Sequence, residues 1–355
     1  MKIFLGLHGT THTEIAQAEI DAFRRAGAET ESCAYGNLGT ASGMLNSLKL
    51  VFKNAGDLRR KAAAQGTNIV YLNTSFDKKT LVRDSITMFI LKRSNPKLKI
   101  VLKFHGSESD VVAAKSMLKN YVLKNADLML TLSTEERENF LRIGVPAQKV
   151  QVTANVIQKE LYVQDPGFKK KAGLTDDTPV LLFVGRFMHE KGILDLVEAC
   201  RLLKQSGTRF CLFCLGNGPL LEDVKAKIGQ YGLEDNIKLP GHIPESETRR
   251  YYANCDVLVL PTYHQEGFPM AVFQAVGAGR PVITTRIRAA ADYFVENEHC
   301  LWVEKKNPQQ LYAQLLALLT NKPLQETMRV NNFALAEKFT ADRIVGKLME
   351  YFKTI

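Results

Sequence analysis

The chain has 355 residues, of which 45% are hydrophobic and 24% are charged, and its formal net charge is +10. That composition is typical of a soluble globular protein and excludes a disordered or fibrous chain. No apolar run reaches the roughly 18–20 residues that a membrane-spanning helix needs. A prior of about 100–200 residues per domain predicts two domains of similar size.

The first residues predict a buried strand. The opening apolar run, residues 3–7, is shorter than the roughly 7–15 residues of a signal-peptide core, so we expect a cytoplasmic protein. Further short apolar or β-branched runs follow, separated by segments with helical spacing. This alternation predicts βαβ units and a mainly parallel sheet. The further strand candidates of the first half are 69–72, 100–104, 128–132 and 150–153.

A break separates the two halves of the chain. Residues 155–178 combine Asp165-Pro166-Gly167, several lysines and Thr175-Asp176-Asp177, which indicates an exposed linker. Strand candidates then resume, and residues 308–352 have the spacing of two or three helices. The strand candidates of the second half are 180–184, 210–215, 237–239, 257–260, 282–284 and 301–303.

These elements predict an α/β protein with two Rossmann-like, doubly wound domains, residues 1–160 and 161–340. We expect the last helix, residues 341–355, to pack back toward the first domain. Open sheets of this type bind ligands beyond the carboxyl ends of their strands. Two such sheets facing each other across a cleft would hold one substrate per domain.

The two cysteines of a CxxC sequence, Cys211 and Cys214, lie within one predicted strand. Positions i and i+3 of a strand point to opposite faces. We therefore predict buried structural cysteines rather than a metal or redox pair.

The positive charge is concentrated in the first half. Residues 1–155 contain 22 Lys/Arg and 14 Asp/Glu, a net charge of +8. Such a surface favours an anionic partner, namely a membrane, a nucleic acid or a phosphorylated substrate, and a solvated basic face is the alternative. Residues 45–61 place Leu48, Val51 and Phe52 among five basic residues. This pattern indicates either an amphipathic helix on anionic lipid or a core-packing helix with a charged outer face.

Residues 180–200 predict a strand, a glycine-containing turn with Gly185, Arg186 and Lys191, and an amphipathic helix. A helix N-terminus attracts anions through its unpaired N–H groups and its dipole. Arginine adds bidentate binding of phosphate. We therefore predict a diphosphate site, with a surface turn carrying incidental charges as the alternative. The spacing does not match a Walker A loop.

Residues 260–275 predict a second strand–loop–helix unit, with the helix beginning near Pro269, a favoured first helical residue. Glu266 precedes this helix, where its carboxylate either accepts hydrogen bonds from hydroxyl groups or caps the helix. Amides around Phe268 and Met270 are placed to bind phosphate oxygens. Gln274 lies about one turn further along, within reach of another hydroxyl group.

Together these segments resemble the retaining glycosyltransferases of the GT-B fold, specifically glycosyltransferase family 4. FVGRFMHEKG resembles the family's donor-phosphate motif, and CDVLVLPTYHQEGFPMAVFQAVGAGRPVITT resembles its E-x7-E signature. LGNGPL, PGHIPESETRRYYANCDV and ADLMLTLSTEERENFLRIGVPAQKVQVTANVI match further family elements in the same order. The resemblance covers most of the chain and implies that residues 1–160 bind the acceptor and residues 161–340 bind a nucleotide sugar.

The resemblance also implies roles for individual residues. Arg186 and Lys191 would neutralise the donor diphosphate and stabilise the leaving nucleotide, so that no metal is required. Glu266 would bind hydroxyl groups of the transferred sugar. His105 matches the family's strand-end histidine near the reacting centre, with a core or loop histidine as the alternative. The other implied donor-binding residues are Gly9 and Thr10 after the first strand, Gly185, His242 and Ile243 at the base, Gly267, Phe268, Pro269 and Met270 in the donor loop, and Gln274.

The sequence departs from the family pattern at three places. Gln274 replaces the second acid of the E-x7-E pair, which usually contacts the ribose hydroxyls, and an amide binds hydroxyls less strongly than a carboxylate does. Val156 replaces the glycine after Asn155, and residues 7–11 lack the usual double glycine. These changes affect the identity of donor and acceptor more than the fold.

The implied reaction is transfer of a sugar from a nucleotide sugar to an acceptor hydroxyl with retention of configuration, a UDP-sugar being favoured and a GDP-sugar the alternative. The basic first domain favours a glycan or lipid-linked acceptor in cell-envelope polysaccharide, lipopolysaccharide or glycolipid synthesis. Such an acceptor would be handled at the cytoplasmic membrane face. A sugar-nucleotide epimerase, a phosphorylase and a non-catalytic binding subunit remain as alternatives. No nucleic acid is expected, because no recognised binding motif accompanies the charge.

Overall fold

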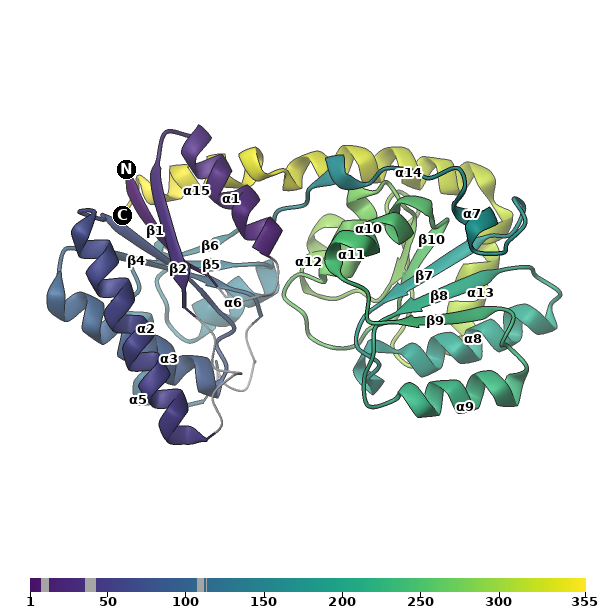
Figure 1. Cartoon of the computed structure of the whole chain (residues 1–355), viewed down its shortest axis with the longest axis horizontal. Helices are drawn as coiled ribbons and strands as arrows, with labels where there is room; N and C mark the ends of the chain where they lie inside the picture. Colours follow the sequence, from purple (N-terminus) through teal and green to yellow (C-terminus); the bar gives the residue numbers. More distant parts are fainter. Residues whose placement is uncertain (8–12, 36–42, 107–111, 113) are drawn as a thin grey trace. The chain divides into compact units, whose positions relative to one another are not determined.

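The computed structural model describes residues 1–7, 13–35, 43–106, 112 and 114–355 (Figure 1). Gly9 and Thr10, expected near the donor, lie outside the described residues. The chain forms two compact units. The first unit comprises Met1–Val156, Glu266–Phe268 and Ala341–Ile355, and the second comprises Ile157–Gln265 and Pro269–Thr340.

The first unit contains a six-stranded parallel sheet with the strand order β2-β1-β3-β4-β5-β6. The structure confirms all five strands predicted in this half. It adds β2, whose sequence ETESCA is largely polar because β2 is an edge strand. The strands are β1 (Lys2–Leu7), β2 (Glu29–Ala34), β3 (Ile69–Thr74), β4 (Lys99–Phe104), β5 (Leu128–Thr131) and β6 (Val150–Val152).

Helices cover both faces of the first sheet. Helices α2, α3 and α5 pack side by side on one face, and α1 and α15 pack together on the other (Figure 1). The core between them is built from apolar strand residues such as Phe4, Leu72 and Leu102. The helices of this unit are α1 (Thr13–Arg25), α2 (Met44–Ala64), α3 (Lys78–Ser94), α5 (Met117–Asn125), α6 (Thr134–Arg142) and α15 (Ala341–Phe352), with a 3-10 turn at Ala147–Lys149.

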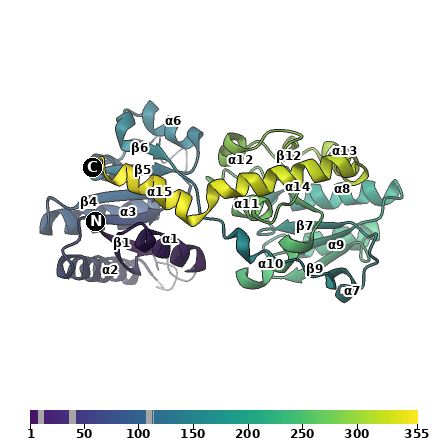
Figure 2. The same ribbon diagram turned by 90° about the horizontal axis from the view of Figure 1, so that it is seen from above.

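The last helix, α15, is held on the first unit by an aromatic cluster. The Phe352 ring stacks on Phe23 with centroids 5.9 Å apart and meets the Tyr71 ring edge-on at 5.9 Å. At the start of the helix, Asp342 accepts two hydrogen bonds from the Arg25 guanidinium. Seen from above, α15 runs beside α1 (Figure 2).

The second unit also contains a six-stranded parallel sheet, with the order β12-β11-β10-β7-β8-β9. All six strands predicted in this half are present. Their near-continuous apolar sequences are typical of parallel sheets covered on both faces. The strands are β7 (Val180–Val184), β8 (Cys211–Leu215), β9 (Ile237–Gly241), β10 (Val257–Leu260), β11 (Val282–Thr284) and β12 (Cys300–Trp302). Cys211 and Cys214 are buried and unbridged, as predicted.

Helices α8, α9 and α13 pack on one face of the second sheet, and α10, α11 and α14 lie on the other (Figure 1). Every helix in the described part of the chain is too short or too polar to cross a lipid bilayer. The helices of this unit are α7 (Phe168–Lys171), α8 (Ile193–Gln205), α9 (Leu221–Tyr231), α10 (Glu245–Asn254), α11 (Met270–Gly277), α12 (Arg288–Tyr293), α13 (Pro308–Thr320) and α14 (Lys322–Ala336), with 3-10 turns at Lys159–Leu161, His189–Lys191 and Glu337–Phe339.

Each sheet has one point where the direction of winding reverses. In the first unit the chain adds β2 on one side of β1 and then β3 on the other, so the reversal lies between β1 and β3. In the second unit the reversal lies between β7 and β10. Open α/β sheets bind ligands beyond the carboxyl ends of the strands at such a point. The loops after β1, β3, β7 and β10 are therefore the candidate functional loops.

Candidate functional site

The loop after β7 carries Gly185 and Arg186 and is held against the loop after β8. Gly185 N donates to Leu215 O at 3.0 Å, and Phe187 N donates to Asn217 O at 3.0 Å. Gly216 has a φ of +139°, and a Cβ there would collide with the Gly185 carbonyl oxygen. Gly216, the first of the two glycines in LGNGPL, is thus required because the two loop backbones touch.

The same loop is also fixed to the loop after β10 through one carbonyl group. Glu190 O accepts hydrogen bonds from Thr262 Oγ1 at 2.9 Å, Tyr263 N at 2.8 Å and His264 N at 3.0 Å. Because three donors share this one acceptor, residues 262–264 are held firmly against Glu190. The two segments predicted to bind phosphate therefore meet at the point of reversal between β7 and β10.

Gly192 also lies in the contact between the loops after β7 and β10, which is termed the junction. Its φ of +69° lies in the left-handed region, and a Cβ there would collide with Pro261 O. Helix α8 starts at the next residue, Ile193. Its first N–H groups, which have no partner within the helix, therefore lie beside the junction. Arg186 is exposed and Lys191 is half-buried. Two cations and a helix N-terminus in one loop form an anion-binding arrangement.

The residues expected near a nucleotide base follow β9. His242 is exposed and Ile243 is half-buried, and the Gly216 N–H donates to Gly241 O at 2.8 Å, which places this loop beside the loop after β8. Helix α10 begins two residues after Ile243, at Glu245. Glu245 Oε1 accepts a hydrogen bond from Gln274 Nε2 of α11 at 3.1 Å.

The loop before α11 is divided between the two units. Glu266, Gly267 and Phe268 group with the first unit, where Glu266 is half-buried and Phe268 is buried. Pro269 and Met270 group with the second unit, and α11 begins at Met270 rather than at Pro269. Pro269 is the residue before the helix, and its carbonyl accepts from Val272 N at 2.9 Å.

His105 lies in the first unit, directly after β4. Its Nε2 atom lies 2.6 Å from Asn73 Oδ1, and Asn73 Nδ2 donates to Gly6 O at 3.1 Å. The backbone N–H of His105 donates to Thr74 O at 2.7 Å. The histidine is therefore held at the ends of β1, β3 and β4, beside the reversal of the first sheet.

A buried polar cluster supports this edge of the first sheet. Asp84 of α3 accepts hydrogen bonds from Thr74 Oγ1 and Tyr35 Oη, both at 2.5 Å, and from Arg83 Nε at 2.8 Å. Burial, followed by the negative charge of Asp84, raises the pKa of Tyr35 well above its ordinary value. Tyr35 is consequently a neutral donor, and Asp84 is satisfied by three partners.

The structure thus brings together, in the second unit, the predicted residues on the loops after β7 and β9 and on α11. Sequence reasoning missed Asn73, Glu190 and Glu245, which act through contacts with distant residues. The only local signal for Asn73 was a polar residue at the end of an apolar strand. Within the described residues, the structure contains no cluster of three or more His, Cys, Asp or Glu side chains suited to a metal ion.

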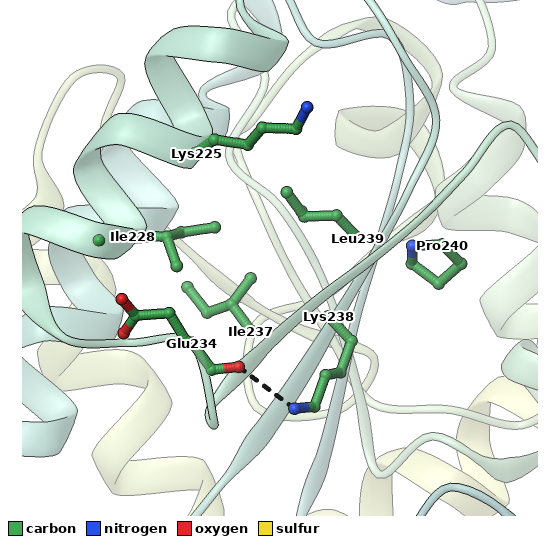
Figure 3. A pocket seen from close by; sticks show the side chains of 8 residues that line it. Lys225, Ile228, Glu234, Ile237, Lys238, Leu239 and Pro240 are labelled. Atoms are coloured by element: carbon green, nitrogen blue, oxygen red, sulfur yellow. Dashed lines mark hydrogen bonds between the residues drawn. The ribbon is translucent and has the colours of Figure 1, made fainter.

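A pocket elsewhere in the second unit does not include any of these residues. It lies between α9 and the edge strand β9, and Lys238 Nζ donates to Glu234 O at 3.2 Å beside it (Figure 3). The residues lining the pocket are Lys225, Ile228, Gly229, Glu234, Ile237, Lys238, Leu239 and Pro240.

Comparison with known families and proteins shows that the chain is similar to glycosyltransferases. Residues 165–334 match the family described as Glycosyl transferases group 1. The putative colanic acid biosynthesis glycosyltransferase WcaL of Escherichia coli K12 is 28% identical over 240 residues, which cover 64% of this chain and 57% of that protein. The amylovoran biosynthesis glycosyltransferase AmsK of Erwinia amylovora is 28% identical over 233 residues, which cover 62% of this chain and 55% of that protein. The alignments thus span little more than half of these relatives.

Solved structures show the same fold. Anabaena Alr3699/HepE in complex with UDP and glucose superposes with a TM-score of 0.78 at 18% identity, covering 100% of both chains. The lipopolysaccharide outer core galactosyltransferase WaaB, in its apo form, gives a TM-score of 0.71 at 17% identity, covering 100% of this chain and 99% of that one. Two six-stranded parallel sheets and these likenesses confirm the predicted GT-B fold.

Proposed function

We propose that this chain, whose residues 165–334 match the family described as Glycosyl transferases group 1, transfers a sugar from a nucleotide sugar to an acceptor hydroxyl group. The observation that carries the proposal is the junction at the reversal of the second sheet. There the loop with Arg186 and Lys191 is fixed to the loop after β10 by three hydrogen bonds to Glu190 O. This junction is a rigid, cationic loop at the ligand-binding edge of a doubly wound sheet.

Arg186, Lys191 and the first amides of α8 would bind the donor diphosphate. As the bond to the sugar breaks, negative charge accumulates on the leaving phosphate, and fixed cations stabilise that charge without reorganising. We propose that these groups replace the divalent metal that other glycosyltransferases use. The leaving phosphate then accepts the proton of the attacking hydroxyl, which approaches from the same face, so that the configuration is retained.

The remaining roles follow the family resemblance. Glu266 binds hydroxyl groups of the transferred sugar, and main-chain groups of His242 and Ile243 hold the base. Gln274 contacts the ribose, and His105 lies near the reacting centre. A UDP-sugar is the favoured donor, and the likeness to Anabaena HepE, whose structure contains UDP and glucose, supports that choice.

We propose a glycan or lipid-linked acceptor in the synthesis of a cell-envelope polysaccharide. The names of the two relatives, which refer to colanic acid and amylovoran biosynthesis, support this assignment. The acceptor would bind to the first unit, in which β1, β3 and β4 end beside His105.

Helix α2 of the first unit supports attachment to an anionic membrane surface. Val51 faces the core, whereas Leu45 and Phe52 are 75% and 55% exposed. Lys49 and Lys53 are exposed on the same helix. Apolar side chains flanked by lysines are typical of helices that lie on anionic lipid. Changing Leu45 and Phe52 together to Ser should abolish flotation with anionic vesicles, whereas changing the exposed Val163 of the second unit to Ser should not. Absence of wild-type enrichment on anionic over neutral vesicles would refute membrane attachment.

Calorimetric titration with UDP, GDP, ADP and their common sugar conjugates tests the proposed donor site. We expect micromolar binding of one nucleotide by the wild-type protein and its loss in Arg186→Ala. Sugar transfer to an acceptor glycan should then follow with the conjugate that binds. Conversion of the nucleotide sugar without an acceptor would indicate an epimerase, and binding without any turnover would indicate a non-catalytic subunit. No binding of any nucleotide would refute the proposal.

A further inference from the structure

Glu245 and Gln274 form a hydrogen-bonded pair between two helices of the second unit. Glu245 is the first residue of α10, and Gln274 lies in α11. Gln274 Nε2 donates to Glu245 Oε1 at 3.1 Å, and both side chains are half-buried. A carboxylate can only accept hydrogen bonds, so the contact fixes the orientation of the amide. The NH₂ group of Gln274 faces Glu245, and its carbonyl oxygen faces elsewhere.

Two tyrosines lie close to this pair, Tyr252 buried and Tyr162 half-buried. Burial, followed by the negative charge of Glu245, raises the pKa of Tyr162 above its ordinary value. The rings of Tyr162 and Tyr252 meet edge-on with centroids 6.1 Å apart. The Glu245 backbone is held by Thr248 Oγ1, which donates to Glu245 O at 2.7 Å. The Glu245 carboxylate therefore lies close to Tyr162, two residues after Ile243 in the sequence.

Together, Glu245 and Gln274 supply the hydrogen-bond acceptors that a single acid at position 274 would supply. The Gln274 amide oxygen and the Glu245 carboxylate are both hydrogen-bond acceptors, and vicinal hydroxyl groups of a ribose are donors. A glutamate at position 274 would bring two carboxylates to about 3 Å, where one of them must be protonated or both are destabilised. The glutamate at position 245 thus favours an amide, and not a second acid, at position 274.

We propose that Glu245 supplies the carboxylate that position 274 lacks, and that Glu245 and Gln274 jointly bind the ribose hydroxyls of the donor nucleotide. This inference rests on the proposed function, because it requires a nucleotide at the carboxyl edge of the second sheet. It assigns a nucleotide-binding role to Glu245, which no sequence motif indicated. It also explains how a site without the second acid retains a charged acceptor for the ribose.

Calorimetry on matched variants tests the assignment with the nucleoside diphosphate that binds best among UDP, GDP and ADP, and with its 2′,3′-dideoxy form. Glu245→Gln should weaken binding of the ribonucleotide about tenfold or more, since charged hydrogen bonds of this kind are worth that factor. Binding of the dideoxy form should change little. Glu247→Gln, which alters an exposed acid of the same helix, serves as the control.

The exchanged pair provides a second test. Gln274→Glu alone should weaken binding, because it places two carboxylates together. The double variant Glu245→Gln/Gln274→Glu restores one acid and one amide and should recover most of the affinity. Thermal unfolding of each variant separates a loss of binding from a loss of folding.

The outcomes separate this inference from the proposed function. If the wild type binds a nucleotide and Arg186→Ala abolishes that binding, but Glu245→Gln leaves affinity unchanged, the role of Glu245 is refuted and the proposed function stands. An equal loss for ribonucleotide and dideoxynucleotide in Glu245→Gln also refutes it, since the carboxylate would then read another part of the ligand. If the wild type binds no nucleotide, both proposals fail.

Discussion

Asn73 fixes the imidazole of His105 through a 2.6 Å hydrogen bond between Asn73 Oδ1 and His105 Nε2. The amide nitrogen of Asn73 is committed to the Gly6 carbonyl, so the atom that faces the histidine is the oxygen, an acceptor. His105 Nε2 must therefore carry a proton. In the neutral imidazole the other nitrogen, Nδ1, is then the basic one.

We predict that in Asn73→Ala the imidazole of His105 is no longer restricted to the Nε2-H tautomer. Nitrogen NMR of ¹⁵N-histidine-labelled protein should show His105 as the Nε2-H form in the wild type and as a mixture in the variant. His299 is an internal control, because its Nδ1 accepts from Val295 N at 3.2 Å and should remain unchanged. An unaltered His105 spectrum in Asn73→Ala would show that Asn73 does not set the tautomer.

The two cations of the loop after β7 should contribute separately to nucleotide binding. We expect Arg186→Ala and Lys191→Ala each to weaken binding by a factor of about 10–150, since a hydrogen bond to a charged group contributes about 1.5–3 kcal/mol. Arg209→Ala removes an equally positive but exposed side chain that pairs with Asp177, and it should leave the affinity within twofold. Calorimetric dissociation constants check this. Similar losses in all three variants would mean that net charge, and not the loop, attracts the nucleotide.

The sequence predicted the strands well because both sheets are parallel and covered on two faces, which makes their strands continuous apolar runs. It missed β2 because ETESCA, an edge strand, lacks such a run. Residues 155–178 predicted an exposed linker, yet Phe168 of α7 is buried against Phe213 and Tyr251. A short helix among lysines and turn residues has too little apolar periodicity to be recognised.

The candidate site was predictable only in part. Glycines and cations marked the loop after β7, because phosphate chemistry requires those residue types in a short stretch. The contacts that fix the site join residues far apart in the chain: Glu190 with Thr262, Asn73 with His105, and Glu245 with Gln274. Local patterns do not encode such pairings, which depend on which strand ends are neighbours in the sheet.

The junction between the loops should be sensitive to a single methyl group. Gly192→Ala forces a positive φ on alanine and a collision with Pro261 O, so we expect a loss of several kcal/mol in the free energy of unfolding. Gly207→Ala has a similar φ of +74° but open space around the new Cβ, and it should cost only about 1 kcal/mol. Denaturation followed by fluorescence of Trp302, the single tryptophan, measures both. Equal losses would show that the loop moves to accommodate the methyl group.

Asp127 should make the stability of the first unit depend on pH. Burial alone would raise its pKa, but hydrogen bonds from Lys92 and Ile100 and the charges of Lys92 and Lys99 outweigh burial, so the pKa is lowered. A carboxyl whose pKa is lower in the folded state stabilises the protein above its unfolded pKa of about 3.9. This stabilisation disappears as the pH falls through the folded pKa.

We therefore expect Asp127→Asn to reduce the free energy of unfolding by about 1–3 kcal/mol at pH 7 and by progressively less as the pH falls below the unfolded pKa of about 3.9. Urea denaturation monitored by circular dichroism at several pH values measures the difference. Asp21→Asn is the comparison, since Asp21 pairs with Arg24 on an exposed surface and should have little effect at any pH. A constant difference between wild type and Asp127→Asn across this range would contradict the lowered pKa.

Docking of α15 on the first unit should depend on one aromatic side chain and not on its exposed ion pair. Phe352→Ala removes a buried ring that packs on Phe23 and Tyr71, and we expect it to cost about 3–5 kcal/mol. Asp342→Ala breaks an exposed pair with Arg25 and should cost at most about 1 kcal/mol. Circular dichroism reports both units, whereas Trp302 reports the second alone, so Phe352→Ala should shift the dichroism transition to lower urea ahead of the fluorescence transition. Coincident shifts of both signals would show instead that the two units unfold together.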